Sequence, residues 1–510
     1  MNISKRHFLV CPFLFATYPM LFLYAHNMEW VQPVDLVKPF MISMMLAIIV
    51  VLTAWLLVRD RIKTEIMASV VLIVFFYYGH LYTILRGKAV VGFVLGRTIV
   101  LYPLFCLFLL IAVVLVVRTK KDLSSISRFL MVMSIIIVIM PLIQITAYYM
   151  GSNRQGAQKW KSYVDRSCRQ DALQPDPRKT LPDVYYIILD NYSRADLLKD
   201  DLGYDNSKFI DFLTRKGFYV ASKSNSNYLG TVNSLPSSLN FNLLTTLGEE
   251  SGYVIAMNSS RLDRIRYCKV AVLLRQAGYR FVTFPSGFSV TGYFNADKVY
   301  KRSFWDVTEF DRVFLNSTML MAPFAIVPEK IFESVGQLAD YRRDILYTFD
   351  SIKQVPEIKE PTFAFMHIMV AHPPFVFDAD GNVPKMSFEK MMSVNKFQPF
   401  PLKTYTDAIT FTNKKMEDVI TTILAKSTTP PIIIVQGDHG ISHKVEGIGT
   451  SGNGLLDKKR MHAILNAYYL PDGGNKYLYP TISPVNSFRL IFNHYFGMHY
   501  KMMPDSIYPQ

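Results

Sequence analysis

An aspartate and a histidine stand side by side at Asp438 and His439, between Gly437 and Gly440. The five residues before them, 432–436, read Ile-Ile-Ile-Val-Gln, the pattern of a strand covered on both faces. Carboxylates and imidazoles bind divalent metals, and in open α/β sheets ligands bind at the carboxyl ends of strands. The alternative is an ordinary polar turn, which the pair alone would favour. The strand and the flanking glycines favour a metal site.

Two further strand ends carry polar groups that could converge with this pair. Val184–Leu189 is a second buried-type strand and ends at Asp190. Phe363–Ile368 is a third, and His372 follows it in a His-Pro-Pro turn. Two carboxylates and an imidazole are a ligand set suited to a divalent metal.

A hydroxyl group lies at an expected helix start in the segment 230–239, Gly-Thr-Val-Asn-Ser-Leu-Pro-Ser-Ser-Leu. Such a hydroxyl is usually only a helix cap, and we interpret Ser237 or Ser238 in that way. Thr231 differs if it faces the metal, because a metal-bound oxygen loses its proton more easily and becomes a nucleophile. The helix dipole would then favour an incoming phosphate or sulfate.

Strands and helices alternate through the polar part of the chain. Asn206–Lys216, Val270–Gln276 and Thr404–Lys426 have helical patterns, and Tyr279–Phe284 is a further strand. This alternation predicts an α/β domain over residues 183–510, with a largely parallel sheet flanked by helices.

Residues 1–150 are expected to form a transmembrane domain. Each of five apolar segments is close to the ~20 residues that a bilayer core requires. They are Phe8–Tyr24, Phe40–Val58, Ile66–Leu85, Ile99–Val117 and Phe129–Tyr149. The first lacks a small-residue cleavage site and is interpreted as an anchor. More Lys and Arg residues lie in the loops on the amino-terminal side, which predicts that the amino terminus is inside and that everything after residue 150 is outside.

Residues 151–182 are polar and basic, and we interpret them as a juxtamembrane linker. His80 is an ionisable group in the third span, which is a functional hypothesis by default. It lies near the span end among tyrosines, so an interfacial structural role is favoured.

The net charge of the 510-residue chain is +15. With five apolar spans, an anionic membrane surface or an anionic substrate explains this charge better than nucleic acid does. Four cysteines are too few for a disulfide framework. Cys168 and Cys268 could pair if their part of the chain is extracytoplasmic.

Three short blocks together resemble a known family. They are 190–196 (Asp-Asn-Tyr-Ser-Arg-Ala-Asp), Gly230-Thr231 with Pro236, and 437–440 (Gly-Asp-His-Gly). These blocks resemble the sulfatase-type branch of the alkaline phosphatase superfamily. Within it, the chain looks most like the membrane-anchored phosphoethanolamine transferases and the lipoteichoic acid synthases, which are phosphoglycerol transferases.

The resemblance implies one divalent metal ion held by two carboxylates, a threonine and a histidine: Asp190, Thr231, Asp438 and His439. Thr231 would also be the nucleophile. His372 would contact the transferred group, and a second substrate histidine would be His443 or His462. This ligand set suits Zn²⁺ or Mn²⁺ better than Mg²⁺.

The chain also departs from the family pattern. It has no Cys/Ser-x-Pro-x-Arg motif, which disfavours sulfate ester hydrolysis through formylglycine. It has fewer cysteines than the disulfide-rich phosphoethanolamine transferases. The segment 287–295 lacks the Trp and Arg with which lipoteichoic acid synthases bind glycerol phosphate. The sequence therefore does not identify the donor head group.

These features lead to three functional hypotheses. The first is a multi-pass transferase of the bacterial cytoplasmic membrane with a periplasmic or extracellular catalytic domain. It would move a phospho-head group from a membrane phospholipid to an envelope glycan or lipid through a threonine intermediate. The second is a hydrolase of phosphate or sulfate esters at the same site. The third is a non-enzymatic envelope or transport protein, against which the intact set of site residues argues.

Overall fold

The computed structural model describes residues 9–85, 89–90, 93–94, 98–173, 175, 180–252, 258–284, 286, 288–292, 295–301, 303, 307–320, 337–385, 399–442, 445–446 and 458–508. The chain divides into two compact units. The apolar unit comprises Met1–Arg154 and Trp305–Gln337. The sheet unit comprises Gln155–Phe304 and Leu338–Gln510.

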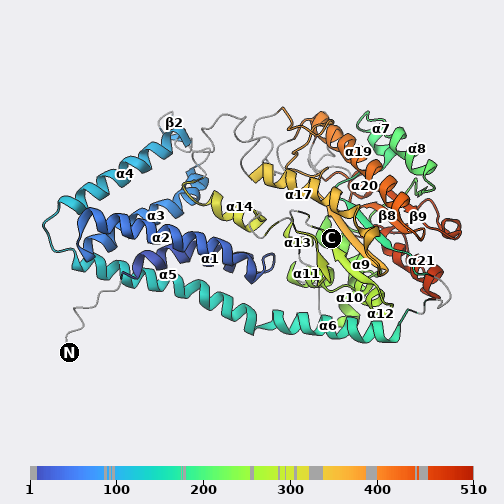
Figure 1. The fold of residues 1–510 in the computed structure, drawn as a ribbon, viewed down its shortest axis with the longest axis horizontal. Coiled ribbons are helices and arrows are strands. Elements are labelled where there is room, and N and C mark those ends of the chain that lie inside the picture. The colour runs from blue at the N-terminus through green and yellow to red at the C-terminus, as the bar shows by residue number, and fades with distance from the viewer. Residues whose placement is uncertain are drawn as a thin grey trace. The chain divides into compact units, whose positions relative to one another are not determined.

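Where the structure describes it, the apolar unit contains five long helices (Figure 1): α1 (Cys11–Asn27), α2 (Val37–Val58), α3 (Arg61–Leu85), α4 (Thr98–Arg118) and α5 (Ser124–Met150). A short turn of 3-10 helix, Pro33–Leu36, precedes α2, and a hairpin of β1 (Ala89–Val90) and β2 (Phe93–Val94) follows α3.

Four helical segments among the described residues are long and apolar enough to cross a membrane: Pro33–Val58, Arg61–Tyr82, Val100–Arg118 and Ser124–Gln170. The span expected at Phe8–Tyr24 corresponds to α1, which has 17 residues. At ~1.5 Å per residue that helix is slightly shorter than a bilayer core of ~30 Å. Four of the five expected spans are therefore supported.

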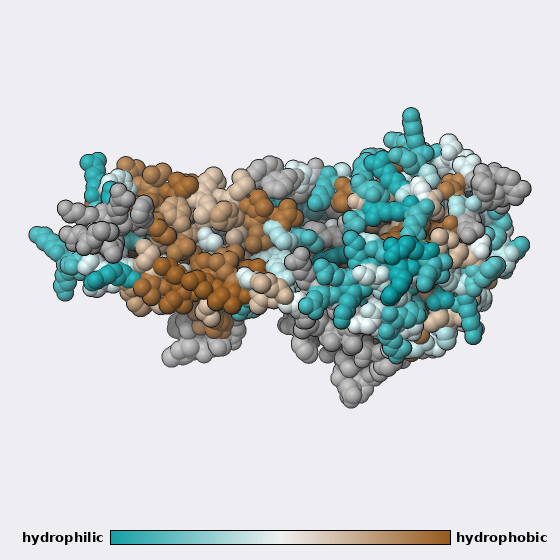
Figure 2. Space-filling model, turned by 90° about the horizontal axis from the view of Figure 1, so that it is seen from below, coloured by the Kyte–Doolittle hydropathy of each residue, from teal (hydrophilic) through white to brown (hydrophobic). Residues whose placement is uncertain are grey.

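The helices of the apolar unit differ in how much apolar surface they expose. α3 packs against α1, α2, α4 and α5. On the outer helices, large apolar side chains such as Leu56, Leu115 and Phe129 are 71, 64 and 63% exposed. Figure 2 shows the resulting brown surface. His80 is exposed and lies near the rings of Phe22 and Tyr77, as expected for a residue at a span end.

A segment that lies beyond residue 300 belongs to the apolar unit, which was not predicted from the sequence. Its helix α14 (Glu309–Asn316) buries Phe310 and Phe314 with residues of α1 and α3. Asp311 forms a buried ion pair with Lys38 of α2, with 2.5 Å between Nζ and Oδ2.

The backbone after α14 is hydrogen-bonded directly to α3. The N–H of Gly79 donates to the carbonyl of Ser317 at 2.9 Å, and Phe75 accepts from the N–H of Met319 at 2.8 Å. In a regular helix, residues 75 and 79 would bond each other. A Cβ at Gly79 would lie 2.2 Å from the carbonyl oxygen of Asn316, so only glycine permits this approach.

We expect Gly79→Leu to displace residues 316–319 from α3, because the new side chain would occupy the position of their backbone. Limited proteolysis of the detergent-solubilised protein should then cut faster within residues 305–337. Leu81→Ala, at an exposed position of the same helix, is the matched control. An unchanged digestion pattern in Gly79→Leu would contradict this arrangement.

The described residues of the sheet unit form seven strands: β3 (Val184–Leu189), β4 (Tyr219–Val220), β5 (Arg280–Thr283), β6 (Lys298–Val299), β7 (Thr362–Ile368), β8 (Ile432–Gly437) and β9 (Asn466–Tyr469). Their order is β4-β9-β8-β3-β7-β5-β6. β3, β5, β6, β7 and β8 pair in parallel, whereas β9 runs antiparallel to both β8 and β4. The sheet is therefore mixed, and the expected largely parallel sheet is found in its centre.

Helices cover both faces of the sheet. One face packs on α8 (Ser207–Arg215), α17 (Gln337–Ile352) and α19 (Leu402–Lys426), whose apolar residues share a core with β3 and β8. On the other face, the ring of Tyr186 packs against that of Phe488 of α21 (Pro484–Phe496), with 5.1 Å between the ring centroids. The helix α9 (Thr231–Leu239) packs on α21. The helices and strands expected in this unit from periodicity are confirmed within two residues at each end.

Other helical elements among the described residues of the sheet unit are shorter or peripheral. They are α6 (Ser152–Gln170), α7 (Ala195–Asp200), α10 (Leu244–Ser251), α11 (Asn258–Arg266), α12 (Lys269–Gln276), α13 (Ser289–Gly292), α20 (Lys458–His462) and two 3-10 turns, Val355–Glu357 and Gly474–Tyr477. Much of the expected linker is the helix α6, whose Trp160 donates from Nε1 to the carbonyl of Tyr267 at 2.9 Å. Cys168 and Cys268 are both buried free thiols.

The register of the three central strands places their carboxyl ends side by side. Leu189, the last residue of β3, pairs with Ile368 of β7 and with Gly437 of β8. The N–H of Asp190 continues this ladder by donating to Ile368 at 2.9 Å. Polar residues that follow β3 and β8 therefore emerge next to each other.

At the opposite end of β3, we expect Asp183→Asn to stabilise the protein at alkaline pH. Burial raises the pKa of Asp183 from 3.8 to about 6, although its Oδ1 accepts a hydrogen bond from the N–H of Thr362. Folding therefore favours the protonated form, so the native carboxylate costs stability as pH rises from about 4 to above 6. An amide keeps the acceptor and carries no charge. The variant should gain ~1–2 kcal/mol at pH 8, measured as a higher Tm, and nothing at pH 4. An equal gain at both pH values would contradict this account.

Candidate metal centre

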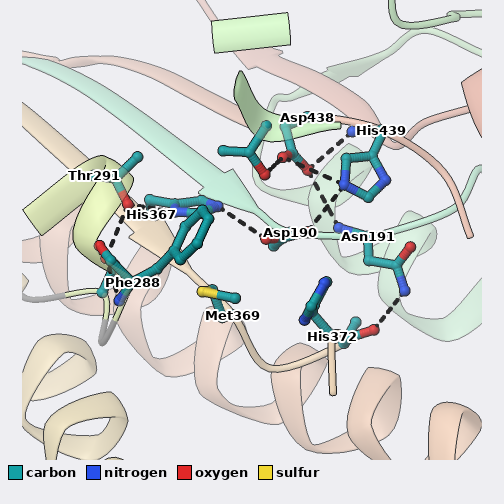
Figure 3. A network of polar contacts seen from close by, with 12 residues as sticks. Asp190, Asn191, Phe288, Thr291, His367, Met369, His372, Asp438 and His439 are labelled. Atoms are coloured by element: carbon teal, nitrogen blue, oxygen red, sulfur yellow. Dashed lines mark hydrogen bonds and ion pairs between the residues drawn. The ribbon is translucent and has the colours of Figure 1, made fainter. Parts of the chain in front are cut away.

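Two carboxylates and an imidazole meet where β3 and β8 end. Asp190 follows β3, and Asp438 and His439 follow β8. The Nε2 atom of His439 lies 3.3 Å from Asp190 Oδ1 and 3.7 Å from Asp438 Oδ2. These residues are at most 3% exposed. Figure 3 shows the three side chains directed at one another.

Backbone donors fix the orientation of Asp438. Its Oδ1 accepts from the N–H of His439 at 2.9 Å and from the N–H of Asn191 at 3.2 Å. The φ angle of Asn191 is +62°, a left-handed conformation that asparagine tolerates better than most residues. The second oxygen of Asp438, Oδ2, is thereby left to face Thr231.

The turn after β8 requires glycine at its end. A Cβ at Gly440 would lie 2.3 Å from the carbonyl oxygen of Arg460. The carbonyl oxygen of Gly440 also accepts from His439 Nδ1 at 2.8 Å. A carbonyl oxygen cannot donate, so Nδ1 carries the proton and Nε2 is left to face the carboxylates.

Thr231 lies beside this cluster. It is the first residue of α9, as expected from the sequence, and it is 7% exposed. Its Oγ1 donates to Asp438 Oδ2 at 2.7 Å. A hydroxyl at the amino end of a helix, against a carboxylate, is well placed to receive an anionic group.

His367 also contributes to the cluster, although it was not among the residues predicted from the sequence to form the site. It lies within β7, and its Nε2 is 3.3 Å from Asp190 Oδ2 (Figure 3). Ligand atoms of Asp190, His367 and Asp438 all lie within 4.8 Å of one another. The available signal was a histidine inside an otherwise apolar, fully buried strand.

The electrostatics of the cluster fit a divalent cation. Burial disfavours the Asp190 carboxylate, yet His372, His367 and His439 outweigh it and hold the pKa of Asp190 well below its usual value. Burial likewise disfavours protonated His439, but Asp438 and Asp190 raise its pKa to about 10, so Nε2 carries a proton at neutral pH that a bound divalent cation would replace. Within the part of the chain that the structure describes, Asp190 Oδ1 and His367 Nε2 are buried without hydrogen-bond partners. Two carboxylates, two imidazoles and a hydroxyl suit Zn²⁺ or Mn²⁺.

The expected substrate histidines have different surroundings. His372 is partly exposed, and it is close enough to Asp190 to favour its ionisation. Its loop is held by Asn191, whose Nδ2 donates to the carbonyl of Ala371 at 2.8 Å. His462 is buried, and its Nδ1 bonds the carbonyl oxygen of Ser226 at 2.8 Å, which indicates a structural role. His443 lies outside the described residues.

We expect Asp190→Asn to weaken metal binding by at least ~100-fold, because the variant loses a charged group that binds the metal directly. Metal content after dialysis against a competing chelator would measure the loss. Asp183→Asn, which removes a carboxylate at the other end of β3, is the matched control and should keep its metal. Retention of metal by both variants would show that Asp190 is not a ligand.

The sequence and the fold were compared with known proteins. The sulfatase family model matches residues 182–480. No curated protein sequence matches the chain.

Solved structures with a similar fold were also found. The periplasmic domain of EcEptC from Escherichia coli is 13% identical, with a TM-score of 0.40, covering 64% of this chain and 86% of that chain. The lipooligosaccharide phosphoethanolamine transferase EptA from Neisseria meningitidis is 13% identical, with a TM-score of 0.36, covering 92% and 89%. The lipoteichoic acid synthase LtaP from Listeria monocytogenes is 12% identical, with a TM-score of 0.34, covering 62% and 72%. With the family match extending over more than half of its length, the chain belongs to the sulfatase family.

Proposed function

We propose that the protein is a membrane-anchored phosphotransferase that uses Thr231 as its nucleophile. The observation that carries this proposal is the hydrogen bond from Thr231 Oγ1 to Asp438 Oδ2, at the start of a helix and beside a second buried carboxylate. This arrangement provides an attacking oxygen and an acceptor for its proton. A divalent cation bound by Asp190, Thr231, Asp438 and His439 would lower the pKa of the hydroxyl and offset charge on the phosphoryl oxygens.

In the first half-reaction, Thr231 Oγ1 attacks the phosphorus of a lipid phosphodiester. A phosphorus–oxygen bond to the threonine forms as the bond to the lipid alcohol breaks. The threonine proton passes to Asp438 Oδ2, to which it is already hydrogen-bonded. His372, at the partly exposed edge of the site, protonates the departing alcohol.

In the second half-reaction, an acceptor hydroxyl attacks the same phosphorus. His372, now neutral, takes the proton of that hydroxyl, and Asp438 returns its proton to Thr231 as the phosphothreonine bond breaks. The transferred group then resides on the acceptor, and the site is restored.

The apolar unit supports a lipid as donor. Helices that cross a bilayer keep the site of the same chain near lipid head groups, which raises their local concentration. We place the site outside the cytoplasmic membrane of a bacterium, with the acceptor hydroxyl on an envelope glycan or lipid. The transferred head group is of the phosphoethanolamine or phosphoglycerol type.

We expect the parent protein to carry a covalent adduct on its Thr231 peptide after incubation with membranes, detected by mass spectrometry. Thr231→Ser should keep an adduct because it keeps a hydroxyl, and Thr231→Ala should have none. The mass of the adduct identifies the transferred group. Transfer of a labelled head group by Thr231→Ala at the parental rate would overturn the proposal. Release of the group as a free product, without a labelled acceptor, would indicate a hydrolase instead.

A further inference from the structure

A chain of buried hydroxyl groups leads from the backbone to His367. Ser286 and Thr291 lie in the segment that follows β5, and both are at most 3% exposed. Ser286 Oγ lies 2.9 Å from the carbonyl oxygen of Phe288, and Thr291 Oγ1 lies 2.8 Å from Ser286 Oγ. His367 Nδ1 lies 2.7 Å from Thr291 Oγ1. Figure 3 shows Thr291 and Phe288 beside His367.

The direction of every hydrogen bond in this chain follows from its first acceptor. A carbonyl oxygen only accepts, so the single proton of Ser286 is directed at Phe288. Ser286 Oγ then accepts from Thr291, and it also accepts from the N–H of Phe288 at 3.1 Å. The single proton of Thr291 is therefore used as well. Thr291 can bond His367 only as an acceptor, which places a proton on Nδ1.

A proton on Nδ1 leaves Nε2 of the neutral imidazole as a lone pair. That atom lies 3.3 Å from Asp190 Oδ2 and has no hydrogen-bond partner among the described residues. A lone pair facing a carboxylate is unfavourable unless a proton or a metal cation lies between them. His439 has the same arrangement, because its Nδ1 proton is held by the carbonyl of Gly440. Both imidazoles therefore present Nε2 to the same carboxylate.

We propose that Ser286 and Thr291 are positioning residues that fix the tautomer of His367 and make it a further ligand of the metal centre. The resemblance to the sulfatase family implies a single histidine ligand, and this arrangement adds a second. The segment after β5 thereby joins the site, although neither of its hydroxyls touches the reacting group. The inference rests on the metal centre of the proposed function but not on the transfer reaction.

Nitrogen NMR of the full-length protein, labelled with ¹⁵N in the histidine rings and loaded with Zn²⁺ in detergent, tests the tautomer directly. His367→Gln assigns the signals. We expect a protonated Nδ1 and an Nε2 signal that shifts when Zn²⁺ binds. A protonated Nε2 in the loaded protein, or an Nε2 signal that Zn²⁺ does not move, would overturn the inference. This measurement does not depend on Thr231, so failure of the adduct experiment leaves it interpretable.

Substitution of Thr291 tests the role of the hydroxyl. We expect Thr291→Val to weaken Zn²⁺ binding by ~10–100-fold, as is usual when a group that orients a ligand is lost. Thr291→Ser should bind within ~3-fold of the parent, because it keeps the acceptor oxygen. The matched control is Thr412→Val, which removes a buried hydroxyl that donates to the carbonyl of Ala408 in its own helix. Equal affinities in the valine and serine variants of Thr291 would overturn the positioning role. If Thr291→Val does not fold, the NMR spectrum of the parent decides alone.

Discussion

The catalytic half of the molecule depends on holding two carboxylates together where water is almost absent. Asp190 and Asp438 are each 1% exposed, and one imidazole lies within 4 Å of both. Like charges in a buried site repel each other strongly, and without positive charge one of them would take up a proton. The surrounding histidines and the backbone N–H groups bonded to Asp438 reduce this cost, and a divalent cation would remove most of it. The backbone N–H donors, the amino end of α9 and the adjacent strand ends all serve to hold these two buried carboxylates together.

Three strands position the charged and imidazole groups of this site, and their parallel pairing brings those groups together. β3, β7 and β8 end at the same edge, so each supplies one or two groups without a long loop. Rigid strands hold ligands more accurately than loops do. The groups that we assign to the substrate lie instead on the segments after the strands, as with His372.

Much of this arrangement could be predicted, because apolar periodicity marks strands such as Val184–Leu189 and the polar residue that follows them. The direction of β9 could not be predicted in the same way. It pairs antiparallel with β8, and no local pattern in the sequence distinguishes it from a parallel strand. His367 was missed because one histidine in an apolar strand usually has only a structural partner. The helix α14 was missed because its sequence reads as an ordinary amphipathic helix, and nothing local reveals that its apolar face packs in the first unit.

The placement of α14 has a practical consequence for anyone who isolates the catalytic half. A fragment that starts at residue 155 is continuous in sequence but still carries residues 305–337, which belong to the other unit. Phe310, Phe314 and Met319 would lose the helices that bury them, and their apolar surface would be left in water. Such a fragment would tend to aggregate or need detergent. A soluble form of the sheet unit would therefore need a polar segment in place of residues 305–337.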